Sequence, residues 1–297
     1  MKNNFDGIMP ALLTPFTKGG ERVDYDSACA LAERLVQQGV QGIFVCGTTG
    51  EGMLMTLEER KKLLDVVVVA VGKKINVVAH TGCLDTQSTI NLTLHAAAMG
   101  AAAAGIITPG FYGYDDDSLA AHYKAVAKAV KGFPILLYDL PSCARNALST
   151  KFVLDLARDV KNIVGIKVSK QDIVSFSALA MDMPKDFALI NGADEYTYQA
   201  YLSGATGTVS STANVLPELF LGIRAHVAKG ELKKAWAMQR SLSAACGLFQ
   251  YGKMVAYYKE GLRLRGFDAG YVRPPQRELT KDERKAFAKA LEKAKLI

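Results

Sequence analysis

The sequence has few of the features that would place it in a membrane or in a disulfide-bonded fold. Five of its 297 residues are cysteines, widely spread and without a C-x-x-C pair or a neighbouring His-rich cluster, so neither a disulfide framework nor a metal site is predicted. The longest apolar stretch, VVVVAV at 66–71, is too short to span a bilayer, and residues 1–20 lack the basic start and apolar run of a leader peptide. We expect a soluble, cytoplasmic protein with no membrane association.

The sequence also lacks blocks of like charge. Lys and Arg total 36 against 29 Asp and Glu, which gives a net charge of +7, but the basic residues are scattered through helical segments and no aromatic platform is interleaved with them. Nucleic acid is therefore not an expected partner. The hydrophobic fraction of 49% suits a sizeable core, and the length fits either two ordinary domains or one large α/β barrel.

Short apolar runs recur along the chain with amphipathic helical segments between them. Such alternation indicates βα units and a parallel sheet, and eight units predict a (β/α)8 TIM barrel. A doubly wound sheet is the alternative, but no Gly-rich nucleotide-binding fingerprint follows the first run. The eight runs are IMPALLT (8–14), GIFVC (42–46), INVVAH (75–80), AGIIT (104–108), PILLY (134–138), IVGIK (163–167), FALIN (187–191) and GTVSS (207–211).

Helix signals agree with this division. Thr56 with Glu59, and Thr280 with Glu283, have the spacing of a capping box at a helix start. No strand run follows Pro217, and the remaining chain is typical of helices. We predict a barrel over 1–216 and, over 217–297, a closing barrel helix with a C-terminal helical extension in the same structural unit.

Polar residues follow most of the predicted strands, at the barrel end where active sites gather. The turn GTTGEG (47–52) offers two hydroxyls and unhindered backbone N–H groups, which suit a carboxylate or phosphate; it is equally compatible with a tight βα turn. Tyr138 ends the fifth run and is also compatible with a core tyrosine. His80 ends the third and is interpreted as a packing residue.

Lys167 stands where the sixth apolar run ends. Because side chains alternate along a strand, Ile163, Gly165 and Lys167 are predicted to share one face, and Lys170 to face the opposite way. A nucleophilic amine must be neutral, and burial at a barrel mouth lowers the pKa of a lysine. An inward lysine beside a tyrosine and an anion-binding turn provides the amine, proton shuttle and carboxylate clamp that a Schiff base with a 2-oxo acid requires.

The ordered set of motifs resembles the pyruvate-dependent class I aldolase superfamily of N-acetylneuraminate lyase and dihydrodipicolinate synthase. GTTGE, TP with a following tyrosine, YDLP and GIK carry the resemblance, which extends from ALLTPF (11–16) through STANVLPEL (211–219). It implies that Lys167 forms the Schiff base with pyruvate, that Tyr138 shuttles the proton, and that Thr48 and Thr49, with Gly50, bind the pyruvyl carboxylate. No cofactor or metal is implied beyond the covalent imine.

The same resemblance implies an assembly. A tyrosine after the fourth strand completes a Tyr-Thr-Tyr relay from a neighbouring subunit in this family, and by spacing that residue is Tyr112, with Phe111 and Tyr114 as neighbouring alternatives. A homotetramer built as a dimer of dimers is therefore expected.

Departures from the family patterns bear on the substrate. Synthases of this family carry an arginine after the fifth strand, in a YNVPSR-like pattern, that holds the carboxylate of the aldehyde. Here the stretch reads YDLPSC, with Cys143 at that place, Arg145 two residues later, and Asp139 where the family usually has Asn. This weakens the synthase interpretation, whereas STANV (211–215) resembles the synthase branch.

The stretch NGADE (191–195) resembles the sugar-binding segment of sialic-acid lyases. Asp194 and Glu195 are predicted to accept hydrogen bonds from sugar hydroxyls, although they are also compatible with a helix cap. By the same resemblance Ser169, Gly192 and Ser211 are substrate-binding residues. The sequence predicts a Schiff-base lyase or aldolase that cleaves a sialic acid or a 2-keto-3-deoxy sugar acid, with 4-hydroxy-tetrahydrodipicolinate synthase as one alternative and a non-catalytic barrel that binds small acids as another.

Overall fold

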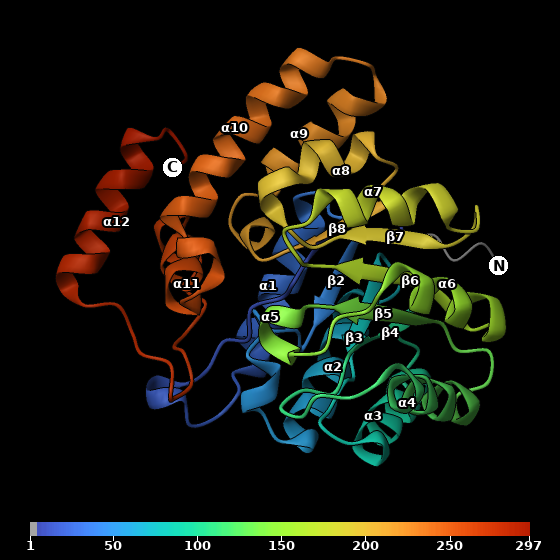
Figure 1. The fold of residues 1–297 in the computed structure, drawn as a ribbon. Coiled ribbons are helices and arrows are strands. Elements are labelled where there is room, and N and C mark those ends of the chain that lie inside the picture. Colours follow the sequence, from blue (N-terminus) through green and yellow to red (C-terminus); the bar gives the residue numbers. More distant parts are fainter. Residues whose placement is uncertain (1–4) are drawn as a thin grey trace.

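The computed structural model describes residues 5–297, and its centre is a barrel of eight parallel strands (Figure 1). Each strand overlaps one of the eight predicted apolar runs, and nearly all strand residues are buried. The (β/α)8 TIM barrel is confirmed. The strands are β1 (Gly7–Pro10), β2 (Gly42–Val45), β3 (Asn76–His80), β4 (Ala103–Ile107), β5 (Ile135–Asp139), β6 (Ile163–Val168), β7 (Ala188–Asn191) and β8 (Gly207–Ser210).

The strands pair in the order β1-β8-β7-β6-β5-β4-β3-β2. Between β1 and β2 the ring is completed by single contacts: the Leu12 amide donates to the Phe44 carbonyl at 2.9 Å and the Gln41 amide to the Ile8 carbonyl at 3.0 Å. Because all strands are parallel, their carboxyl ends meet at one end of the barrel.

Helices cover the outside of the barrel, and α10, α11 and α12 form the C-terminal extension beside it (Figure 1). Both predicted capping boxes are present, at Thr56 with Glu59 and at Thr280 with Glu283. The helices are α1 (Tyr25–Gln37), α2 (Leu57–Val71), α3 (Thr86–Ala98), α4 (Asp116–Ala129), α5 (Pro141–Ala144), α6 (Thr150–Asp159), α7 (Ile173–Asp182), α8 (Thr197–Leu202), α9 (Pro217–Ala228), α10 (Leu232–Leu248), α11 (Val255–Leu264) and α12 (Lys281–Lys293). Over residues 5–297, no helix combines the length and the apolar character needed to cross a membrane.

Strand β6 departs from simple alternation. Ile135 of β5 pairs with Ile163, but the next residue, Leu136, pairs with Gly165, so one residue of β6 is skipped. Ile163 consequently packs with Ile166 in the cluster between strands and helices, while Lys167 points to the barrel interior. The prediction that Ile163 shares a face with Lys167 was wrong because this bulge shifts the alternation.

Candidate active site

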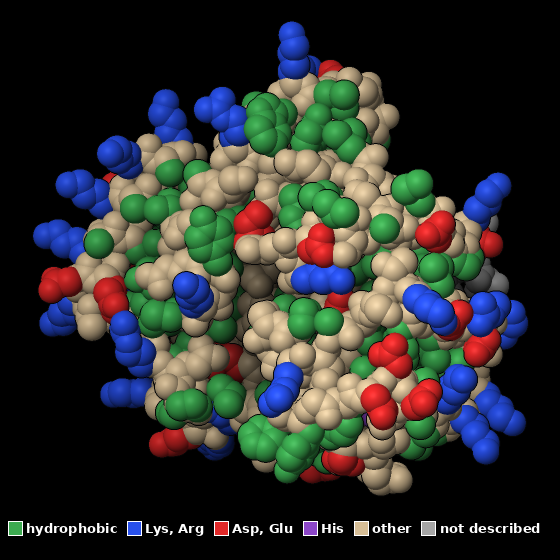
Figure 2. Space-filling model, in the orientation of Figure 1, with side chains coloured by type: hydrophobic (Ala, Val, Ile, Leu, Met, Phe, Trp, Pro, Cys, Tyr) green, Lys and Arg blue, Asp and Glu red, His purple; other side chains and the backbone are tan. Residues whose placement is uncertain are grey.

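A cavity of about 1170 Å³ opens where the strands end, and Figure 2 shows a hollow near the middle of this face. Its wall combines residues from the ends of β5 to β8, the turn after β2, and the C-terminal extension. Predicted site residues that line it are Thr48, Thr49, Tyr138, Lys167, Ser169, Gly192, Glu195 and Ser211. Gly50, Tyr112 and Asp194 are not among the lining residues.

Lys167 and Tyr138 lie side by side at the bottom of the cavity. They are register partners on β6 and β5, and the Lys167 Nζ lies 3.9 Å from the centroid of the Tyr138 ring and 4.6 Å from that of Phe44. Lys167 is 5% exposed and has aromatic faces around its amine. An amine held against aromatic rings at the wall of a cavity has the surroundings expected of the predicted nucleophile.

The turn after β2 brings hydroxyls to the same place. The Thr48 Oγ1 is 3.4 Å from the Tyr138 hydroxyl oxygen, so two members of the expected relay meet within one chain. The Thr49 Oγ1 is 2.5 Å from the Ser211 Oγ. Gly50 faces away from the cavity: a Cβ built on it would lie 2.7 Å from the Leu12 carbonyl oxygen, and its carbonyl accepts from the Thr14 hydroxyl at 2.6 Å. Gly50 therefore fixes the shape of the turn.

Gly192 keeps room beside the amine. A Cβ at this position would lie 3.0 Å from the Lys167 Cε and 2.0 Å from the Ser169 Oγ. Any side chain here would displace the lysine or the serine, so glycine is required where β7 leaves the barrel next to Lys167.

The predicted acidic pair is split by the structure. Glu195 lines the cavity and accepts from the Gln171 Nε2 at 2.7 Å. The Asp194 carboxylate instead accepts from the Ser210 hydroxyl at 2.8 Å behind the cavity wall, and burial raises its pKa to about 6. Only Glu195 is placed to meet a sugar hydroxyl. Adjacent residues at the start of a short 3-10 helix, Asp194–Tyr196, point in different directions.

Tyr112 lies outside the cavity, on the loop after β4. It is 64% exposed and packs edge-to-face on Phe111, with ring centroids 4.9 Å apart. Asn146, which the sequence analysis missed, holds this loop: its Nδ2 donates to the carbonyls of Pro109 and Tyr112, each at 2.8 Å, and its Oδ1 accepts from the Tyr114 amide. In a single chain Tyr112 is not brought to Thr48 and Tyr138.

The position of the synthase arginine is also resolved. Cys143 lines the cavity, whereas Arg145 has φ +65° and is exposed outside it. Among the described residues no arginine lines the cavity. The loop after β5 therefore offers a thiol rather than a guanidinium to the substrate.

Several lining residues could not be assigned from the sequence. Lys170 was predicted to face away from Lys167, but β6 ends at Val168, so strand alternation no longer applies and Lys170 lines the same cavity. Others come from the loop before α7, from the 3-10 helix after β7 and from the C-terminal extension, where no local motif marks them. They are Gln171, Tyr196, Tyr251, Lys253, Tyr258 and Gln276.

Comparison with known proteins decides the family. Residues 4–294 match the Dihydrodipicolinate synthetase family. The chain belongs to this family. Among relatives, 4-hydroxy-tetrahydrodipicolinate synthase of Thermus thermophilus is 39% identical over 214 residues, covering 72% of this chain and 71% of that one.

Solved structures of the dihydrodipicolinate synthetase family and its superfamily superpose over nearly the whole chain. YagE, a prophage protein of the family from E. coli K12 in complex with pyruvate, has a TM-score of 0.94 at 26% identity and covers 99% of both chains. N-acetylneuraminate lyase from Mycoplasma synoviae has a TM-score of 0.88 at 27% identity and covers 98% of both. Synthases and lyases are thus both similar to this chain.

Family membership settles the class of protein. Members of the dihydrodipicolinate synthetase family are pyruvate-dependent class I aldolases or lyases that act through a lysine Schiff base, so the chain is an enzyme of this class. The alternative of a non-catalytic acid-binding barrel is therefore overturned.

Proposed function

We propose that the enzyme reversibly cleaves a 2-keto-3-deoxy sugar acid or a sialic acid to pyruvate and an aldehyde. The observation that carries this proposal is the lining of the cavity beyond Lys167. Ser169, Gln171, Glu195 and Ser211 offer hydroxyl, amide and carboxylate groups, which match the alternating donors and acceptors of a hydroxylated chain. A cavity of about 1170 Å³ leaves room for such a chain.

In the proposed mechanism the neutral Lys167 amine attacks the 2-oxo carbon to form a carbinolamine. The Tyr138 hydroxyl gives its proton to the departing hydroxyl group, so that water leaves and a protonated imine and a Tyr138 phenolate remain. The imine withdraws the electron pair of the bond between C3 and C4 when Tyr138 accepts the proton of the C4 hydroxyl, so that bond breaks and the aldehyde leaves. The resulting enamine takes up at C3 the proton that Tyr138 accepted from the C4 hydroxyl. Water then attacks the imine carbon, Tyr138 takes the proton that this releases, and pyruvate and the neutral amine are set free. Synthesis is the reverse sequence.

The carboxylate of the 2-oxo acid is assigned to the turn after β2. Thr48 and Thr49 present hydroxyls to the cavity, and the hydrogen bond between Thr49 and Ser211 at 2.5 Å keeps one of them oriented. The contact between Thr48 and Tyr138 supports a proton path from the reacting carbon to this turn.

Completion of the relay is proposed to need a neighbouring subunit. Phe111, Tyr112 and Tyr114 form an exposed aromatic surface on the loop after β4. In the proposed dimer of dimers, Tyr112 of the partner subunit meets Thr48. We also propose that the enzyme is cytoplasmic, as expected for this family. Light scattering that finds only monomers in active enzyme would contradict this assembly.

A second candidate is 4-hydroxy-tetrahydrodipicolinate synthase, which condenses pyruvate with aspartate semialdehyde. The names of the similar synthases favour it. Cys143 at the place of the arginine, and Arg145 outside the cavity, count against it because the semialdehyde carboxylate would lose its bidentate partner.

Borohydride reduction in the presence of pyruvate, followed by peptide mass spectrometry, tests the imine directly. We expect one adduct, on Lys167, and no adduct in Lys167→Arg, which keeps the positive charge. Lys167→Ala should abolish turnover with the fold intact; pyruvate release by that folded variant would overturn the mechanism.

The aldehyde partner requires a separate experiment. Cleavage of N-acetylneuraminate and of 2-keto-3-deoxygluconate is compared with condensation of pyruvate and aspartate semialdehyde at matched enzyme concentration. Turnover of either sugar acid well above that of the semialdehyde supports the first candidate, and the opposite order replaces it with the synthase.

A further inference from the structure

An ion pair beside the reaction centre has no part in the chemistry described above. The Lys170 Nζ lies 3.3 Å from the Asp139 Oδ2. Asp139 is the last residue of β5 and is fully buried, while Lys170 follows β6 and lines the cavity. The acid at position 139, where the family usually has Asn, therefore comes together with a lysine that faces the substrate.

Both members of the pair are held from behind. The Asp139 Oδ1 accepts from the Leu148 amide at 3.1 Å, and its carbonyl accepts from the Ser169 amide at 2.9 Å. The Lys170 carbonyl accepts from the Tyr196 hydroxyl at 2.8 Å. The Asp139 carboxylate is thus held in the cavity wall, and the Lys170 ammonium lies on the cavity side of the pair. The positive group of the pair therefore faces a ligand in the cavity.

The ammonium of Lys170 keeps donors for that ligand. An ammonium has three N–H donors, and over residues 5–297 Asp139 is its only ion-pair partner. Its side chain is 19% exposed, so water reaches it now and a ligand oxygen can replace that water.

The charges around the cavity favour an anion at this end. Besides the reacting Lys167, Lys170 and Lys253 line it, and within the described part of the chain Glu195 is the one carboxylate that does so. Glu195 is already hydrogen-bonded to Gln171. Asp194, the other member of the predicted acidic pair, does not line the cavity, so one carboxylate rather than two opposes the binding of an anion.

Barrel topology places Lys170 away from the turn after β2, which carries Thr48 and Thr49. In the ring of eight strands β2 and β6 lie opposite each other, so Lys170 faces the turn of Thr48 and Thr49 across the cavity. A 2-oxo acid that is held at that turn and joined to Lys167 directs its remaining chain toward the loops after β6 and β7.

We propose that Lys170, positioned by Asp139, determines specificity by binding an anionic group, a carboxylate or a phosphate, at the end of the aldehyde remote from its carbonyl. This inference rests on the proposed aldol chemistry. Within the two proposed substrate classes it favours 2-keto-3-deoxy sugar acids with a second acid group over sialic acids, whose aldehyde product carries none. A charge-assisted hydrogen bond of this kind contributes a factor of about 10 to 100 in kcat/KM.

The test uses three aldehydes that differ in the end group. Pyruvate is condensed with glyceraldehyde, glyceraldehyde 3-phosphate or tartronate semialdehyde, and kcat/KM is obtained from product formation by mass spectrometry. We expect the wild-type enzyme to prefer one or both anionic aldehydes over glyceraldehyde. A preference for phosphate over carboxylate, or the reverse, identifies which anion the site accepts.

Lys170→Gln keeps an N–H donor for Asp139 and removes the cation. We expect Lys170→Gln to lower the ratio of kcat/KM for the preferred anionic aldehyde to kcat/KM for glyceraldehyde by about 10- to 100-fold. Lys170→Arg should keep most of the wild-type ratio. Lys161→Gln is the matched control, since Lys161 is an exposed residue just before β6; it makes the same charge change away from the cavity and should leave the ratio unchanged.

The ratio to glyceraldehyde within one variant corrects for partial misfolding. An equal loss for charged and neutral aldehydes, or no anionic preference in the wild type, would overturn the inference while leaving the aldol chemistry intact. Failure of the proposed function looks different: no pyruvate adduct forms at Lys167 and no aldehyde is condensed.

Discussion

Two lysine–carboxylate pairs lie near the carboxyl ends of the strands, and they differ in how the lysine is used. Lys259 of α11 pairs with Glu51 at 2.9 Å, with side chains 3% and 0% exposed. Its Nζ also donates to the carbonyls of Thr14, at 2.7 Å, and Tyr271. Three protein oxygens therefore surround the Lys259 ammonium, two as hydrogen-bond acceptors and one as an ion-pair partner. Lys170 has one protein ion-pair partner and lines the cavity.

A lysine enclosed by protein oxygens serves the structure, whereas a lysine with a single protein partner at a cavity wall is available to a ligand. Glu51 belongs to the turn that carries Thr48 and Thr49, and its Oε2 also accepts from the Arg273 amide at 2.9 Å. Through Lys259 and Arg273 the C-terminal extension thus contacts the turn that we propose to bind the substrate carboxylate. The pair of Lys259 with Glu51 holds the turn after β2 in place, whereas the pair of Lys170 with Asp139 presents an ammonium to a substrate in the cavity.

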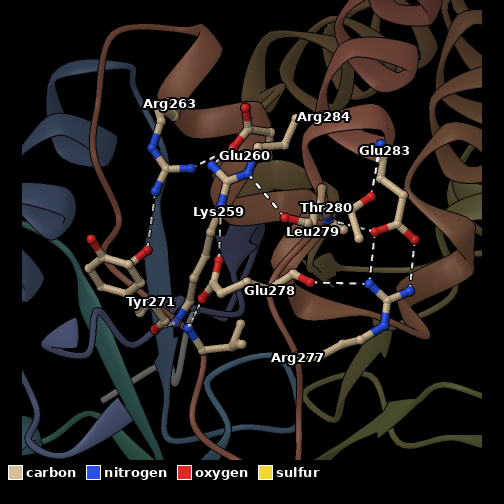
Figure 3. A network of polar contacts seen from close by, with 12 residues as sticks. Lys259, Glu260, Arg263, Tyr271, Arg277, Glu278, Leu279, Thr280, Glu283 and Arg284 are labelled. Carbon is tan, nitrogen blue, oxygen red and sulfur yellow. Dashed lines mark hydrogen bonds and ion pairs between the residues drawn. The ribbon is translucent and has the colours of Figure 1, made fainter. Parts of the chain in front are cut away.

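Further ion pairs surround Lys259 in the extension (Figure 3). Glu260 accepts from Arg263 at 2.5 Å and from Arg284 of α12 at 2.7 Å, and Arg284 also pairs with Glu278 at 3.2 Å. These contacts join α11, α12 and the segment between them. Disturbance of this network is expected to reach the turn after β2 through Lys259.

Of the variants that test the difference between the two ion pairs, Lys259→Met is expected to lose the most unfolding free energy. Removal of one partner leaves Glu51 buried and unpaired, which costs about 3–5 kcal/mol of unfolding free energy. Urea unfolding followed by circular dichroism measures it. Lys170→Gln is the matched variant and should lose far less, because a donor for Asp139 remains; equal losses in the two variants would remove the distinction between the pairs.

The Lys259→Met defect should also depend on pH. Burial raises the pKa of Glu51 above its ordinary value, and Lys259 opposes that rise. Without Lys259 the pKa in the folded state rises further above that in the unfolded state, so the folded state binds a proton more readily and stability falls as pH increases from about 4.5 through the folded-state pKa. We expect a larger deficit at pH 8 than at pH 5.

A second substitution provides the control for that pH dependence. Glu51→Gln combined with Lys259→Met removes both charges and should make the stability deficit nearly independent of pH over the same range. A single variant whose deficit is flat with pH would show that Glu51 is not the group left unpaired.

The barrel, and the proximity of the residues proposed to react, could be predicted from the sequence because both rest on local patterns. Apolar runs specify the strands, and parallel strands bring their final residues together, so Lys167, Tyr138 and Thr48 meet as expected. Those patterns fail where the backbone becomes irregular. The bulge in β6 changes the face of Ile163, and the end of the strand at Val168 returns Lys170 to the cavity.

The remaining site residues depend on contacts that no local motif reports. Lys253 and Gln276 reach the cavity from the extension, far along the chain from the barrel strands. Asp194 and Glu195 have the same charge and are adjacent, and only the position of Ser210 and the cavity wall decides which carboxylate turns inward. Tyr112 stays a prediction because its expected partners belong to another subunit.

The smallest effect is expected at the edge of the extension network, for Arg277→Ala. Arg277 makes two bonds to Glu283, each of 2.7 Å, which are shorter than the 2.9 Å contact of Lys259 with Glu51. Its side chain is 56% exposed, however, so water and salt screen the pair and the unfolded state solvates both groups well. We expect the urea midpoint to stay within experimental error of the wild type, at low salt and in 1 M NaCl. A loss comparable to that of Lys259→Met would mean that bond length, rather than burial and donor satisfaction, ranks the ion pairs of this enzyme.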